Sequence, residues 1–150
     1  VRLGLRPQQR IPVEDQPLEH RTPTAMQNLL AVGLGGFLGA IARYTIGQFV
    51  QSRLASRFPW GTLAVNVIGC LLIGILLGWI SGRQNVSKST ELFLVTGILG
   101  SLTTFSTFGH DTIELLGRGE VPAAVGNVAL NVAVGLVAVA IGLATTRGLA

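Results

Sequence analysis

Four apolar runs, each long enough to cross a lipid bilayer, constrain this chain more than any other feature. The runs cover about residues 26–50, 61–80, 92–116 and 121–145, and the connections between them are short. A helix of about 20 residues rises about 30 Å, which is the thickness of the hydrocarbon core. Short connections also force neighbouring spans to run antiparallel. The sequence therefore predicts an all-α integral membrane protein with four transmembrane helices.

The composition agrees with a membrane protein. Apolar residues make up 49% of the 150 residues and charged residues only 12%, whereas soluble domains carry about 25% charged residues. The 20 glycines suit helices whose backbones approach closely. Gly35 with Gly39, and Gly74 with Gly78, are spaced for such contacts, first of all within the chain. The net charge is +4, but the basic residues are scattered between apolar runs, which argues against a nucleic-acid partner.

Residues 1–24 differ from the rest of the chain. They contain no apolar core of the kind found in secretory signals, and prolines spaced through the segment exclude a helix. We expect a flexible, basic, proline-rich tail on the cytoplasmic side, followed by one four-helix membrane channel domain over residues 25–150. The prolines of the tail are Pro7, Pro12, Pro17 and Pro23.

Basic residues near the span ends are almost equally divided between the two sides of the membrane. The positive-inside rule therefore favours an internal N-terminus only slightly, with support from the arginines of the tail. A near-equal division is typical of a protein that inserts in both orientations, and also of many with one topology. The N-terminal side has Arg21, Arg83, Lys88 and Arg147, and the other side has Arg53, Arg57 and Arg118.

Polar residues inside the first two runs need a partner, water or a function. Arg43 either reaches toward the membrane interface or places a fixed positive charge in a water-filled vestibule that concentrates anions. Asn66 either bonds a neighbouring helix or donates to a passing anion. Thr62, four residues earlier, lies on the same helix face as Asn66.

The stretch SLTTFSTFGHD, residues 101–111, is the most unusual part of the third run. Its hydroxyl side chains follow two glycines, and a helix break there is tolerated only if it is buried or lines water. Phe105 and Phe108 share a helix face, and the positive edges of their rings suit a small anion. With the Asn66 amide they predict an uncharged, electropositive lining that binds an anion weakly enough to release it. The alternative is ordinary core phenylalanines beside hydroxyls bonded to their own backbone.

The sequence leaves open the role of two further groups of polar residues. His110, Asp111 and Glu114 have a spacing that could serve a metal site or a proton relay, but their place near a span end favours a solvated helix terminus. Asn127 and Asn131 lie four residues apart on one face of the fourth span, where they bond neighbouring helices or extend a polar track.

Three segments resemble the signatures of the CrcB/Fluc fluoride channel family: GGFLGAIARY, GTLAVNVIG and GILGSLTTFSTF. The resemblance covers about residues 26–146. It implies a passive, fluoride-selective channel rather than an enzyme, located as a multi-pass protein in the plasma (inner) membrane, which lowers the toxicity of cytoplasmic fluoride. It also implies antiparallel, dual-topology dimers that enclose two pores, and a third helix that is broken near its centre.

The resemblance also assigns residues to the pore. Phe105 and Phe108 correspond to the pore-lining phenylalanines, and Asn66 to the amide that contacts fluoride. Arg43 corresponds to the arginine of the vestibule. The expected polar track consists of Thr62, Ser106 and Thr107.

The family also implies a structural Na⁺ at the dimer centre, bound by backbone carbonyls at positions that match Gly100 and Thr103. Four positions depart from the family pattern, which usually has Ser and Glu after the second phenylalanine and commonly Tyr and Ser on the fourth helix. The change on the fourth helix leaves open whether the chain pairs with an identical copy or with a paralogue. The departing positions are Gly109, Asp111, Asn127 and Asn131.

Two other functions are compatible with four short spans. A proton-coupled four-helix exporter needs a titratable carboxylate well inside a span, and the acidic residues here lie in the tail, in the connections or near span ends. A membrane enzyme needs a base and a nucleophile, for which only His110 with Asp111 is available; a purely structural subunit needs neither. Fluoride conduction is the preferred interpretation.

Overall fold

The computed structural model describes residues 21–83 and 86–147, and helices are the only regular secondary structure in these residues. Four of its helical segments are long and apolar enough to cross a membrane. The shortest, with 22 residues, rises about 33 Å at 1.5 Å per residue. The predicted all-α fold with four membrane-spanning helices is confirmed. The elements are α1 (Arg21–Leu54), α2 (Trp60–Ser81), α3 (Lys88–Glu91), the π-helix η3 (Leu92–Leu99), α4 (Gly100–Leu102), α5 (Phe105–Gly117) and α6 (Val121–Arg147).

Two helix starts differ from the predicted boundaries. The first helix begins at Arg21, so residues 21–24 of the predicted tail are helical. A proline in the first turn of a helix costs little, because its missing N–H has no partner there in any case. The rest of the predicted tail, residues 1–20, lies outside the described residues. The third span begins at Lys88, where the Ser87 hydroxyl caps the helix by accepting the Thr90 N–H at 3.2 Å.

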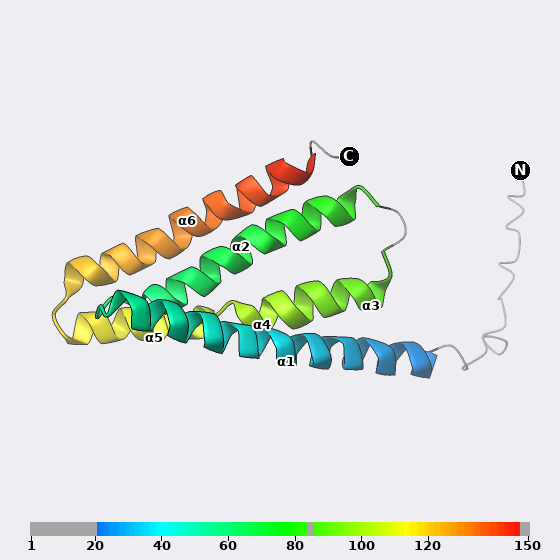
Figure 1. Ribbon diagram of the computed structural model, residues 1–150, viewed down its shortest axis with the longest axis horizontal. Helices are drawn as coiled ribbons and strands as arrows, with labels where there is room; N and C mark the ends of the chain where they lie inside the picture. Colours follow the sequence, from blue (N-terminus) through cyan, green and yellow to red (C-terminus); the bar gives the residue numbers. More distant parts are fainter. Residues whose placement is uncertain (1–20, 84–85, 148–150) are drawn as a thin grey trace, which may run out of the picture.

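The four spans lie side by side in two pairs. The first half of the third span, η3 with α4, packs along α1, whereas α6 packs along α2 and also contacts α5. Figure 1 shows α1 starting and α6 ending at the same end of the bundle, the end that also holds the α2–α3 connection. This arrangement agrees with the predicted sidedness of the loops.

Glycines allow the helices of each pair to touch through their backbones. A Cβ atom on Gly35 would meet the Phe93 carbonyl oxygen and would lie 3.0 Å from the Cα of Gly97. In the other pair, a Cβ on Gly74 would meet the Val139 carbonyl and lie 3.1 Å from the Cα of Gly142. The predicted close contacts at the glycine pairs are therefore confirmed, and they are formed within one chain.

Many large apolar side chains of this protein are exposed on its outer surface, which would be unfavourable in water. The buried cluster is small and centres on Val65, Leu99 and Leu102, while Phe37 on α1 is 65% exposed and Leu136 on α6 is 67% exposed. In water, burying such side chains would gain about 25 cal/mol per Å². Lipid tails are as apolar as leucine and remove that driving force. The outer surface therefore fits a bilayer.

Candidate functional site

The third span is interrupted at two residues with extended backbone. Thr103 has φ −82° and ψ 156°, and Thr104 has φ −150° and ψ 114°. The helix resumes at Phe105, where the Thr104 hydroxyl acts as the N-cap by accepting the Thr107 N–H at 3.1 Å. Threonine is a preferred N-cap residue because its hydroxyl satisfies one of the unpaired N–H groups of the first turn.

The carbonyl groups that precede the interruption are left without helical partners. Where an α-helix ends, its last carbonyls lose the N–H groups that would follow. Among the described residues, the carbonyl oxygens of residues 100–103 accept no hydrogen bond. Gly100 and Thr103, the two residues predicted to bind Na⁺, lie at the two ends of this group.

Asn66 of α2 satisfies the backbone of Thr104. Its Oδ1 accepts the Thr104 N–H at 2.8 Å, and its Nδ2 donates to the Thr104 carbonyl at 3.2 Å. Thr104 is only 7% exposed, so both groups would otherwise be unpaired away from water. The remaining N–H of Asn66 donates to Oδ1 of Asn131 on α6, at 2.9 Å. Both amide N–H groups of Asn66 are therefore used within the chain.

A polar recess of about 420 Å³ lies on one side of the interruption. We call it the arginine recess. Arg57 and Arg118 pair with Glu120 and Glu114 respectively, whereas Arg43 forms no ion pair or hydrogen bond with a described residue. Its charge is thus free to act on the recess. The lining includes Arg43, Arg57, Thr62, Thr104, Thr107, Asp111, Glu114 and Arg118.

A second recess, of about 430 Å³, lies on the other side of the interruption. We call it the phenylalanine recess. The ring centroids of Phe105 and Phe108 are 5.4 Å apart with planes inclined by 53°, and Phe105 is 83% exposed. Thr104 lines both recesses. The lining of this recess includes Asn66, Cys70, Gly100, Thr103, Thr104, Phe105, Phe108 and Asn131.

The structure distributes the predicted pore residues over these two recesses. The arginine recess contains Arg43 with two members of the predicted polar track, Thr62 and Thr107. The phenylalanine recess contains both phenylalanines and Asn66, together with Gly100 and Thr103. Ser106, the third predicted member of the track, lines neither recess; it is exposed, with its hydroxyl 3.2 Å from that of Thr104.

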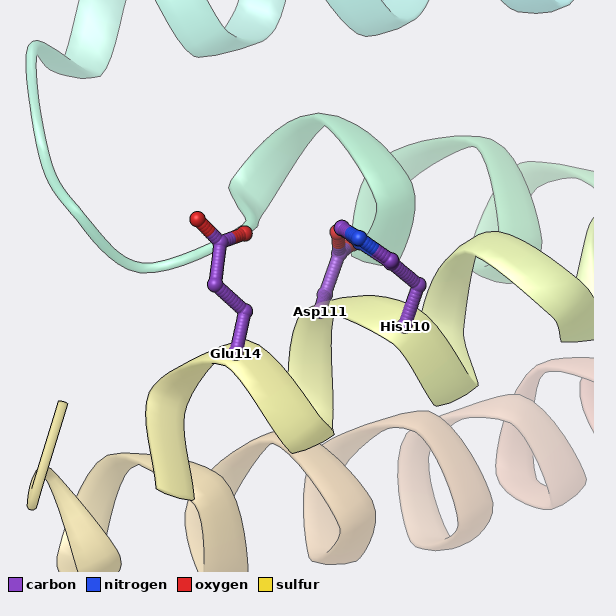
Figure 2. A group of neighbouring side chains, drawn as sticks. All are labelled: His110, Asp111 and Glu114. Carbon is purple, nitrogen blue, oxygen red and sulfur yellow. The ribbon is translucent and has the colours of Figure 1, made fainter. Parts of the chain in front are cut away.

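The acidic end of α5 belongs to the arginine recess. Figure 2 shows the side chains of His110, Asp111 and Glu114 projecting from α5 on the side away from α6. Their candidate ligand atoms lie within 4.8 Å of one another, but Glu114 pairs with Arg118 and Asp111 accepts the Thr62 hydroxyl at 2.7 Å. His110 is exposed. These pairings argue against a metal site, but His110 and Asp111 lie in the middle of α5 and not at its terminus as predicted.

Three residues of the site were given no firm role by the sequence. Thr104 was one of several hydroxyls, and nothing marked it as the residue that separates the recesses. Asn127 and Asn131 were recognised by their spacing, and the structure connects them: the Asn131 amide donates to Oδ1 and to the carbonyl of Asn127, both at 3.0 Å. That Asn131 also bonds Asn66 could not be read from spacing, because the two residues are 65 positions apart.

Comparison with known proteins places the chain in a family. Residues 30–143 match the family described as CrcB-like protein, Camphor Resistance (CrcB). A protein of Chloroflexus aurantiacus named fluoride-specific ion channel FluC is 45% identical over 122 residues, which cover 81% of this chain and 97% of that protein. A FluC of Rhizobium etli is 46% identical over 119 residues, covering 79% and 95%. A FluC of Clostridium perfringens is 44% identical over 125 residues, covering 81% and 98%. The chain therefore belongs to the CrcB family.

Proposed function

We propose that this multi-pass plasma-membrane protein is a fluoride channel, a transporter rather than an enzyme, through which fluoride leaves the cytoplasm down its gradient. Its relatives carry the name fluoride-specific ion channel. The observation that carries the proposal is the interrupted third span, which has an unpaired arginine on one side and two close phenylalanines on the other. Loss of cytoplasmic fluoride would lower its toxicity to the cell.

Each recess would act on the anion in its own way. Arg43 would raise the local concentration of anions in the arginine recess through its long-range field. The edges of the Phe105 and Phe108 rings carry partial positive charge, so they would meet fluoride without binding it too tightly to leave. Ser106 and Thr107 would supply hydroxyl donors that replace water, whereas Thr62 can do so only if it releases its hydrogen bond to Asp111. Asn66 can contact the ion only if Thr104 or Asn131 gives up one of the amide N–H groups.

Fluoride efflux from liposomes that contain the purified protein tests the proposal. Replacing both Phe105 and Phe108 with isoleucine should abolish efflux, because isoleucine keeps the apolar bulk but has no positive ring edge. Phe37→Ile is the matched control, since Phe37 is an exposed phenylalanine of α1 outside both recesses. Equal efflux from the wild type and the double variant would reject the assignment of the two phenylalanines to the pore.

We further propose that the channel is an antiparallel dimer, formed with an identical copy or with a paralogue. Phe105 is 83% exposed in one chain, and a second copy would cover it and close the phenylalanine recess. The near-equal division of basic residues between the two sides is compatible with dual topology. Reporter fusions at the C-terminus should be found on both sides of the membrane in comparable amounts. A single orientation would exclude pairing with an identical copy and leave only a paralogue, and a monomer as the only conducting species in photobleaching counts would contradict the dimer.

The unpaired carbonyls before the interruption suit a sodium ion. Hard cations prefer oxygen ligands, and broken membrane helices use free carbonyls to coordinate them. Gly100 and Thr103 of each copy would provide these ligands at the dimer centre, with Na⁺ as a structural cofactor. Exchange of all Na⁺ for choline during purification should weaken the dimer and slow efflux. An unchanged dimer after that exchange would remove the ion from the proposal.

The proton-coupled exporter is disfavoured by the state of the acidic residues in the third span. Asp111 accepts a hydrogen bond from Thr62 and Glu114 forms an ion pair with Arg118. Neither carboxylate lines the phenylalanine recess, where an exporter would need to exchange a proton for its substrate. Efflux that is insensitive to a proton uncoupler would separate the passive channel from the exporter.

A further inference from the structure

A chain of hydrogen bonds runs from α2 through α6 to α5, and every bond in it points in the same direction. Asn66 donates to Oδ1 of Asn131 at 2.9 Å, and Asn131 donates to Oδ1 of Asn127 at 3.0 Å. Asn127 then donates to the Thr112 hydroxyl at 2.9 Å, and Thr112 donates to the Phe108 carbonyl at 2.8 Å. We call these four side chains the amide relay.

The direction of the relay is fixed at its start. Thr104 donates its N–H to Oδ1 of Asn66, so the NH₂ group of Asn66 must face Asn131. Asn131 must then present its oxygen to Asn66 and its NH₂ to Asn127. Turning any one amide by 180° would place two donors or two acceptors face to face. The amide side chains therefore hold one another in a single orientation.

Burial makes a broken relay costly. Asn127 is 0% exposed, and among the described residues no buried side-chain nitrogen or oxygen lacks a partner. Removing one member would leave the next donor or acceptor unpaired, and the penalty for an unpaired buried group exceeds the mean value of a hydrogen bond. The hydrogen bonds of a buried network strengthen one another, so the loss of one also weakens the others.

The two ends of the relay lie at the backbone next to Phe105 and at the backbone of Phe108. It begins at Thr104, the residue before Phe105, and ends at the carbonyl of Phe108. We propose that Asn131, Asn127 and Thr112 are positioning residues that hold Asn66 and the backbone of both phenylalanines in one fixed arrangement. This inference deepens the proposed function, and its effect on efflux rests on that function.

Thr112 provides a clean test because the chain contains a matched residue. Thr45 on α1 also donates its hydroxyl to the carbonyl four residues earlier, at 2.9 Å, but accepts from no asparagine. Thr112→Val and Thr45→Val therefore both remove a hydroxyl and its bond to the carbonyl four residues earlier, and in Thr45 also a bond to the Ala42 carbonyl. Thr112→Ser keeps the hydroxyl and loses a methyl group, so a role in packing alone would make serine, not valine, the more harmful change.

Two measurements, fluoride efflux and hydrogen exchange at the Thr104 N–H, test these variants. Thr112→Val should slow fluoride efflux ~3-fold to ~10-fold, the range expected for one lost hydrogen bond within a membrane network. It should also speed hydrogen exchange at the Thr104 N–H by a similar factor, although Thr112 does not touch Thr104. Thr112→Ser should stay within ~2-fold of the wild type in both, and Thr45→Val should match the wild type.

Asn131→Ala opens the relay between Asn66 and Asn127 and serves as a second variant. It should raise exchange at Thr104, and adding Thr112→Val to it should change exchange by less than ~2-fold, because the relay is already broken. Fully multiplicative effects of the two changes, or exchange in Thr112→Val equal to that in Thr45→Val, would overturn the inference. If exchange behaves as expected but the wild type conducts no fluoride, the relay stands and the proposed function fails.

Discussion

Replacing Asn66 with leucine tests how the interruption of the third span is stabilised. The substitution removes the acceptor of the Thr104 N–H at 2.8 Å and the donor to its carbonyl at 3.2 Å. It also removes the donor to Asn131 at 2.9 Å. Leucine has the same branched heavy-atom skeleton as asparagine but cannot form hydrogen bonds, and its methyl groups add volume that a second Asn→Leu variant must control for. The main effect falls on Thr104, whose extended backbone has no helical partner.

The expected loss follows from what remains unpaired. A buried N–H or C=O that loses its partner costs about 1–3 kcal/mol, and hydrogen bonds between membrane helices average about 0.6 kcal/mol. Two orphaned backbone groups on Thr104 and one unpaired oxygen on Asn131 together give a loss of roughly 2–4 kcal/mol in the free energy of unfolding.

Asn28 provides the control for this measurement. Its Oδ1 accepts a single interhelical hydrogen bond from Ser89 at 2.8 Å, so Asn28→Leu should cost only about 0.5–1 kcal/mol. Unfolding in mixed micelles, followed by circular dichroism over a titration with SDS, measures both variants against the wild type. If Asn66→Leu proved no more destabilising than Asn28→Leu, Asn66 would not be what stabilises the interruption.

Two further predictions concern the helix contacts and the arginine recess. Gly35→Ala should destabilise the protein by about 1–3 kcal/mol, because a Cβ would meet the Phe93 carbonyl. In the same SDS titration, Gly33→Ala should stabilise it by up to about 1 kcal/mol, because a Cβ there would meet nothing within 4 Å. Equal effects of the two substitutions would contradict the close contact at Gly35. Arg43→Gln should slow fluoride efflux about 2-fold to 5-fold at ~0.01 M salt and much less at ~1 M, where charges are screened within about 3 Å. Arg53→Gln should change efflux at neither salt concentration, and a salt-independent loss in Arg43→Gln would refute an electrostatic role.

The fold could be predicted closely because it depends on properties that are local in the sequence. Continuous apolar runs give the spans, and the four-residue glycine spacing gives the contacts at Gly35 and Gly74. The predicted end of the first span, near residue 50, falls short of the end of α1 at Leu54. The start at Arg21 was missed because Pro23 was taken as a helix breaker, although proline breaks a helix only when it lies beyond the first turn.

Several residues that line the two recesses could be named from the sequence, but their pairings could not. Glycines followed by hydroxyls indicated that the helix around residues 101–107 was weak. The partner that completes the break, Asn66, lies 38 positions from Thr104, and only the packing of α2 against the third span brings them together. Asp111 likewise meets Thr62 across 49 positions. Periodicity identifies residues on one helix face, but it does not say which face of another helix they will meet.

Thr104 has one more consequence, for the membrane as an electrical insulator. Among the residues that the structure describes, it alone lines both recesses, so at this point a single residue separates them. A voltage across a bilayer falls mainly where polarisable water is excluded, and a unit charge crossing it gains or loses about 2.3 kcal/mol per 100 mV. If both recesses hold water and open to opposite sides of the membrane, part of that work falls across Thr104.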